Sequence, residues 1–200
     1  MKVDLACGDN KHEGFIGIDI VDIPEVDIVH DLSVYPWPLE DNSVDEVVCN
    51  HYIEHIPHDD ILGDIKDILK ETTSFDEFKE KLLNKKKSKD GFIKFLEELH
   101  RILKPGGKAK IVAPYATNVR AYGDPTHTRY IHDWSFYYAN KEWMDNNKLT
   151  HYDIKADFDV KFSYFIDDEL SLKSTEVRQD AFKRDWNSIV DLIVELTKRN

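Results

Sequence analysis

Short apolar runs, each bounded by glycine, proline, or an acidic or amide residue, recur through the first half of the chain. Runs of this length that are rich in β-branched residues are typical of buried strands in a parallel sheet. The pattern therefore predicts five strands, at residues 2–7, 15–20, 26–30, 44–50 and 108–113.

Stretches with helical spacing separate the fourth and fifth of these strands. Apolar residues recur at that spacing over residues 61–69, and an S-x-x-E capping box at Ser74 and Glu77 precedes a second helix. Asp90 is placed to cap a third helix. The Lys-Pro-Gly-Gly run at residues 104–107 ends it, because proline cannot continue a helix and glycine makes the turn.

Towards its end the chain predicts a late antiparallel hairpin over residues 152–166 and an amphipathic helix over residues 180–198. We expect an α/β fold: a Rossmann-like, mostly parallel sheet with helices on both faces and the hairpin at one edge. A length of 200 residues favours a single domain. Its expected parts are a cofactor-binding core (1–113), a helical, charged insertion (57–91), an aromatic- and histidine-rich segment (114–150), and the hairpin with the C-terminal helix (151–200).

Composition narrows the class of protein. The formal charge of −12 makes nucleic acid an unlikely partner, because the chain and a phosphate backbone repel each other. No apolar run approaches the roughly 18 residues of a membrane span, so we expect no membrane partner. Two cysteines, Cys7 and Cys49, make no disulfide framework, which favours a cytoplasmic location.

Candidate ligand-binding residues follow the first four predicted strands. In an open α/β sheet, ligands bind outside the carboxyl ends of the strands. Small residues, two carboxylates and an amide at those positions suit an adenosine without phosphates, and the chain has no G-x-x-x-x-G-K-[ST] or G-x-G-x-x-G motif. These residues are Ala6, Cys7, Gly8, Asp19, Asp31, Leu32, Asn50 and His51.

The order of several short motifs resembles that of the class I S-adenosylmethionine-dependent methyltransferases, of the small type 11-like kind with phage and bacterial members. The motifs are D-L-A-C-G at residues 4–8, G-I-D at 17–19, P-W-P-L-E-D-N-S-V-D at 36–45, I-E-H-I at 53–56, L-K-P-G-G at 103–107 and D-P-T-H at 124–127.

The resemblance implies S-adenosylmethionine as cofactor, S-adenosylhomocysteine as product, and a role for each matching residue. By this resemblance Asp4 lies near the methionine amino group, and Ala6, Cys7 and Gly8 form the turn that faces the methionine and the ribose. Asp19, with Ile20 beside it, binds the ribose, and Asp31 and Leu32 contact the adenine. Asn50 and His51 line the methionine. Two features depart from the family. Ala6 stands where glycine is usual, and the 11 residues from Gly8 to Asp19 leave no room for a full helix after the first strand.

The segment after the fifth strand is the expected acceptor side. Asp124 can orient His127, a candidate base or acceptor clamp, and His51 is a second candidate base. The alternative is that Asp124 and Pro125 form a turn in which His127 only caps or packs. Tyr115, Arg129 and His132 are candidate substrate-binding residues, although Arg129 also suits a structural pair with an aspartate.

The run His51-Tyr52-Ile53-Glu54-His55 fits the H-x-x-E-H pattern of some zinc enzymes. It directly follows a core strand and coincides with the E-H of the family motif, so we expect no metal and a structural role for His55. A zinc hydrolase is a further alternative, and it predicts stoichiometric metal in the purified protein.

Together these observations predict methyl transfer to a small-molecule or glycan acceptor, with an oxygen acceptor favoured because candidate bases are present. A non-catalytic S-adenosylmethionine-binding or scaffolding module is the alternative. The oligomeric state is left open between a monomer and a homodimer.

Overall fold

The computed structural model describes residues 1–58, 65, 68–84 and 89–199. A seven-stranded sheet runs through it in the order β3-β2-β1-β4-β5-β7-β6. The strands are β1 (Lys2–Leu5), β2 (Ile16–Asp19), β3 (Ile28–Val29), β4 (Val44–Asn50), β5 (Leu103–Pro114), β6 (Phe158–Ile166) and β7 (Ile189–Lys198). The described helices are η1 (Ile53–His55), α2 (Phe75–Asn84), α3 (Gly91–Ile102), α4 (Arg120–Gly123), α5 (Trp134–Tyr137), α6 (Lys141–Asn146), η2 (Thr150–Tyr152), α7 (Asp168–Ser171) and α8 (Thr175–Arg184).

The sheet confirms the predicted α/β, Rossmann-like class. Strands β3, β2, β1, β4 and β5 are parallel to one another, and β7 is antiparallel to both β5 and β6. All five predicted parallel strands exist; β4 has the predicted bounds, and the ends of the other four are shifted. Strand β5 begins early because Leu103 pairs with Val44 before the register shifts and Lys108 pairs with Glu46.

The predicted helix over residues 180–198 is wrong. Helix α8 ends at Arg184, and residues 189–198 form strand β7 between β5 and β6. Apolar residues lie on both faces of β7, Ile189 and Ile193 on one and Leu192, Val194 and Leu196 on the other, and such a run fits a helical stripe as well as a strand. The late hairpin exists as β6 and β7, not within residues 152–166, and helices α7 and α8 lie in its connection.

Helix α3 forms as the sequence predicts and supplies much of the core. Asp90 caps it by accepting a hydrogen bond from the Phe92 amide at 2.9 Å. Phe95, Leu96 and Leu99 are fully buried, so the predicted apolar stripe faces the sheet. The capping box is also present, since Ser74 Oγ accepts from the Glu77 amide at 3.2 Å. Most of the helix predicted over residues 61–69 lies outside the described residues.

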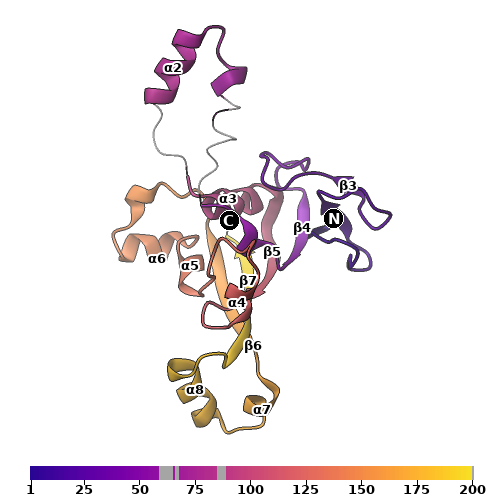
Figure 1. Ribbon diagram of the computed structural model, residues 1–200, viewed down its shortest axis with the longest axis vertical. Helices are drawn as coiled ribbons and strands as arrows, with labels where there is room; N and C mark the ends of the chain where they lie inside the picture. The colour runs from indigo at the N-terminus through magenta and orange to yellow at the C-terminus, as the bar shows by residue number, and fades with distance from the viewer. Residues whose placement is uncertain (59–64, 66–67, 85–88, 200) are drawn as a thin grey trace.

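No helix is contributed by residues 1–52, all of which the structure describes. Loops and turns alone connect β1 to β2, β2 to β3, and β3 to β4, which confirms that the helix after the first strand is absent. Figure 1 shows the helices gathered around the β4–β7 part of the sheet, with α2 and the α7–α8 pair at opposite ends of the long axis. The first three strand ends are therefore bordered by loops.

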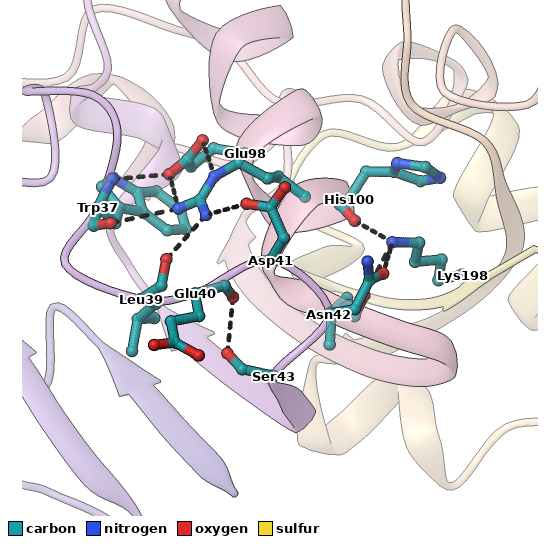
Figure 2. A network of polar contacts seen from close by, with 11 residues as sticks. Trp37, Leu39, Glu40, Asp41, Asn42, Ser43, Glu98, His100 and Lys198 are labelled. Carbon is teal, nitrogen blue, oxygen red and sulfur yellow. Dashed lines mark hydrogen bonds and ion pairs between the residues drawn. The ribbon is translucent and has the colours of Figure 1, made fainter.

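A polar network explains the motif at residues 36–45. The Glu98 carboxylate accepts from the Trp37 amide at 2.7 Å (Figure 2). The Arg101 guanidinium donates to Glu98, to the Leu39 carbonyl at 2.7 Å and to Asp41 at 2.7 Å. These bonds hold the loop before β4 against helix α3, so the motif has a structural role here.

Among the described residues, no helix is both long enough and apolar enough to span a bilayer.

Candidate cofactor and acceptor sites

The sheet has a topological switch point between β1 and β4. The chain runs from β1 to β2 and β3 on one side, and then returns to place β4 and β5 on the other side. A crevice forms at the carboxyl ends of the strands where the order reverses, and ligands bind there in open α/β sheets. The structure therefore brings the predicted cofactor residues to one edge of the sheet.

Asp19 joins the end of β2 to the turn after β1. Its carboxylate accepts hydrogen bonds from the Gly8 amide at 2.9 Å and from the Val21 amide at 3.2 Å. Ala6 and Gly8 both have left-handed backbones, with φ of 54° and 52°. This conformation is costly for Ala6 and explains why glycine suits that position better.

Asp4 is 2% exposed, and its carboxylate is already engaged. It accepts from the backbone amide of His12 at 2.8 Å and lies 2.7 Å from His12 Nδ1. Asp4 therefore anchors the loop between β1 and β2, whatever contact it makes with a ligand.

The two cysteines lie next to the predicted cofactor residues and are both buried. Burial, reinforced by the charges of Asp4 and Asp19, raises the pKa of Cys7 to about 11, and burial raises the pKa of Cys49 well above its usual value. Both thiols are protonated at neutral pH and pack as small apolar groups. A side chain at Gly17 would come within 2.7 Å of Cys7 Sγ, so strand β2 and the turn after β1 pack closely.

The ends of β2 and β3 carry the residues predicted to contact the adenosine. Ile20 is 64% exposed although it is a large apolar residue. Asp31 is exposed, and its carboxylate accepts from the amide and the hydroxyl of Ser33 at 2.9 and 2.7 Å. Leu32 is buried, and its carbonyl accepts from the Trp37 indole at 3.0 Å.

At the end of β4, His51 follows Asn50 with a left-handed backbone, φ 52°, and donates its amide to the Val112 carbonyl at 2.8 Å. Its ring is half-buried and lies 3.4 Å from a Glu54 oxygen. The Glu54 carboxylate raises the pKa of His51. His51 is predicted both to line the methionine part of the cofactor and to act as a base toward the acceptor.

A cleft of about 580 Å³ opens beside His51. The residues that line it are His51, Glu54, His55, Pro114, Arg120, Gly123, Asp124, Pro125 and His127. Two segments far apart in sequence meet here because the Glu54 carbonyl accepts from the amides of Thr128 and Arg129, at 2.8 and 3.1 Å.

The D-P-T-H segment forms a turn, which was one of the two predicted alternatives. Asp124 accepts from the amide and hydroxyl of Thr126 at 2.8 and 2.6 Å, and these bonds lower the pKa of Asp124. His127 is nearly buried, and its Nδ1 lies 3.1 Å from the Ala121 carbonyl. Its Nε2 lies 3.9 Å from the second oxygen of Asp124, so no hydrogen bond joins them.

The three residues predicted to bind substrate do not line this cleft. Arg129 is 8% exposed and donates to the carbonyls of Ile56 and Pro57 at 2.6 and 2.7 Å and to the Asp90 carboxylate at 2.9 Å. These contacts favour the alternative in which Arg129 forms a structural pair with an aspartate over the one in which it binds the substrate. Tyr115 is buried and packs 5.4 Å from the ring of His132, which is paired with Asp133.

Sequence reasoning missed two polar residues of this site, Glu54 and Arg120, and assigned His55 to structure alone. Glu54 is 1% exposed, and neither of its carboxylate oxygens has a hydrogen-bond partner among the described residues. The sequence did contain a signal for Glu54, because this residue is the glutamate of the H-x-x-E-H run that follows a core strand. A glutamate that is fully buried is unusual.

No protein-family model matches this chain, and no curated protein sequence matches it. Solved structures do match. A SAM-dependent methyltransferase from Archaeoglobus fulgidus aligns with a TM-score of 0.57 at 18% identity, over 98% of this chain and 85% of that one. Enzymes of the same description from Methanosarcina mazei (TM-score 0.49, 13% identity, 99% and 92% covered) and Mesorhizobium loti (0.48, 13%, 98% and 90%) also align.

The strand order and the Archaeoglobus match define the class of fold. The chain has the Rossmann-like fold of the class I S-adenosylmethionine-dependent methyltransferases. Its identity to these structures is low, so the likeness extends to the fold.

Proposed function

We propose that this protein binds S-adenosylmethionine across the carboxyl ends of β1 to β4 and transfers its methyl group to an oxygen acceptor, a small molecule or an exposed glycan. The observation that carries this proposal is Asp19, a carboxylate at the end of β2 that is held by the amide of Gly8 in the turn after β1. A carboxylate at this position of a Rossmann-like sheet is suited to accept from the hydroxyls of a ribose.

The other strand-end residues fit the remaining parts of the cofactor. Ala6 and Gly8 place backbone without bulky side chains beside it. Ile20 offers an exposed apolar surface next to Asp19, and Asp31 has an exposed carboxylate for an adenine amine. Bound there, S-adenosylmethionine supplies a methyl group that is already activated as a sulfonium.

The contribution of the protein is then to align an acceptor oxygen with that methyl group and to receive its proton. The cleft beside His51 is the proposed acceptor site, since His51 lies at the end of β4 and lines the cleft. His51 and His127 are the proposed proton acceptors. Asp124 positions the turn that carries His127 through its bonds to Thr126.

The proposal is tested by calorimetric binding of S-adenosylmethionine and S-adenosylhomocysteine to the full chain and to Asp19→Asn. We expect the variant to bind more weakly by about 1–3 kcal/mol, because a charge-assisted acceptor is lost. Asp22→Asn is the matched control, because Asp22 is an exposed aspartate in the same loop. Equal affinity in wild type and Asp19→Asn would contradict the assignment.

A non-catalytic module that binds S-adenosylmethionine is the second candidate. It is favoured by the absence of any helix between β1 and β2 and by the costly left-handed backbone of Ala6. Incubation with labelled S-adenosylmethionine and panels of hydroxyl and carboxyl acceptors separates the two. Binding without methyl transfer to any acceptor supports the module, and labelled product supports the enzyme.

A further inference from the structure

The buried carboxylate of Glu54 is the starting point. It sits in η1 at the inner wall of the cleft, and neither oxygen has a hydrogen-bond partner among the described residues. Its ion-pair partner is His51, whose Nδ1 is 3.4 Å away and which is charged only when protonated. A buried carboxylate that accepts no hydrogen bond is costly, so it calls for a cation.

Two imidazoles lie close enough to share a cation with Glu54. One ligand atom each from Glu54, His55 and His127 lies within 4.8 Å of the others. The rings of His55 and His127 meet edge to face with centroids 4.7 Å apart. Small side-chain rotations bring such atoms to the 2.0–2.2 Å typical of zinc ligands.

The hydrogen bonds of His127 leave its Nε2 as the acceptor nitrogen. Nδ1 lies 3.1 Å from the Ala121 carbonyl, which can only accept, so Nδ1 carries the proton. In a neutral ring the lone pair is then on Nε2, which faces the cleft residues. A histidine that donates its other nitrogen to a backbone carbonyl is the usual arrangement at a metal.

His55 is oriented in the same way by a longer chain of bonds. Its Nδ1 lies 3.1 Å from Thr126 Oγ1, and that hydroxyl donates its own proton to Asp124 at 2.6 Å. The hydroxyl oxygen therefore accepts from Nδ1 of His55, which leaves Nε2 of this ring unprotonated as well. Asp124 and Thr126 thus act as positioning residues for a histidine ligand.

We propose that Glu54, His55 and His127 bind one divalent transition-metal ion, with zinc the best match to two imidazoles and one carboxylate. The site differs from the H-x-x-E-H interpretation, because the second histidine comes from the turn at residues 124–127 and not from His51. Arg120, the cation on the cleft wall, is paired with Asp191 at 3.1 Å and does not neutralise Glu54.

Three protein ligands would leave a fourth tetrahedral position for an oxygen ligand, and all three residues line the cleft. If the proposed methyl transfer also holds, a bound metal would make an acceptor hydroxyl lose its proton more readily, because zinc lowers the pKa of a bound oxygen. With a metal bound, both ring nitrogens of His127 are engaged, so His51 is then the remaining proton acceptor. This role rests on the proposed function, whereas metal binding itself does not.

The test uses the full chain, stripped with a chelator and titrated with zinc against a competing chromophoric chelator. We expect one zinc per chain in the wild type, and loss of that site in His127→Asn and Glu54→Gln. His151→Asn is the control, because it removes an exposed histidine outside the cleft. Circular dichroism verifies that each variant is folded.

A second variant keeps the proposal testable if Glu54→Gln does not fold. Thr126→Val keeps the shape of the side chain and removes the acceptor for His55, so zinc should bind about 10–100-fold more weakly. A wild type that binds no zinc, or a His127→Asn variant that binds it as well as the wild type, overturns the proposal. S-adenosylmethionine binding is measured on the same samples, so a failure of the metal site is distinguishable from a failure of the methyltransferase assignment.

Discussion

At the scale of single residues, several charged side chains hold loops in place. Asp4 binds the loop between β1 and β2 through His12, and Arg129 joins two carbonyls to Asp90. The same Asp90 carboxylate also caps helix α3. Glu54 is the exception, since its buried carboxylate accepts no hydrogen bond from any residue that the structure describes, and for that reason it points to a ligand.

Replacing Arg129 tests its structural role. In Arg129→Met the Asp90 carboxylate and two carbonyls lose charged donors in a buried setting, so we expect a loss of about 3 kcal/mol in the free energy of unfolding. Urea denaturation measures it. Arg184→Met is the control, because Arg184 forms an exposed pair with Asp180 and such pairs contribute about 0–1 kcal/mol. Similar losses in the two variants would argue against the structural role.

At the scale of elements, helix α3 is held at both ends, and its last turn shows two opposing electrostatic effects. His100 lies in that turn, where the helix dipole favours a charged imidazole. Its ring is half-buried against Phe158, and burial, aided by the positive charges of Lys198 and Lys141, lowers its pKa instead. Desolvation is therefore the larger effect at this position.

The lowered pKa of His100 makes stability depend on pH. Between the folded pKa and the unfolded value near 6.5, the unfolded chain binds more protons than the folded chain. Stability therefore falls as the pH drops below about 6.5 and is retained above it. We expect His100→Gln to lose less stability than the wild type between pH 7 and about 5, as measured by urea denaturation. Identical pH profiles would contradict this.

At the scale of the whole molecule, the C-terminal strand is tied to elements from the first half of the chain. Strand β7 pairs with β5 and β6 along most of its length. Its buried Lys198 donates to Asn42 Oδ1 at 2.7 Å and to the carbonyls of His100 and Leu103 at 2.6 and 2.8 Å (Figure 2). This ammonium links β7, helix α3 and the loop before β4.

Removing that ammonium should loosen all three elements together. Lys198→Met leaves three acceptors without their donor, so we expect a loss of about 2 kcal/mol in the free energy of unfolding, seen as a lower midpoint in thermal unfolding. Lys155→Met is the matched control, because Lys155 is exposed and its ion pair is with the equally exposed Asp153. A midpoint that is unchanged in Lys198→Met would rule out this link as a stabilising contact.

The cleft beside His51 shows why part of the candidate site was beyond sequence reasoning. The proposed cofactor residues follow strands whose apolar runs are local, so their placement at one edge of the sheet was predictable. The cluster of Glu54, His55 and His127 depends on hydrogen bonds from Thr128 and Arg129 to the Glu54 carbonyl, more than 70 positions away. No local pattern encodes that contact.

The sequence by itself determined the parallel strands, helix α3 with its cap, and the missing helix after β1, because each depends on spacing within a short stretch. The tertiary structure alone decided that residues 189–198 form an interior strand and that Arg129 pairs with Asp90. It also decided that Glu54 is buried with no hydrogen-bond partner in the part of the chain that the structure describes. Those outcomes depend on which distant segment covers a side chain, and burial of that kind is set only when the whole sheet is assembled.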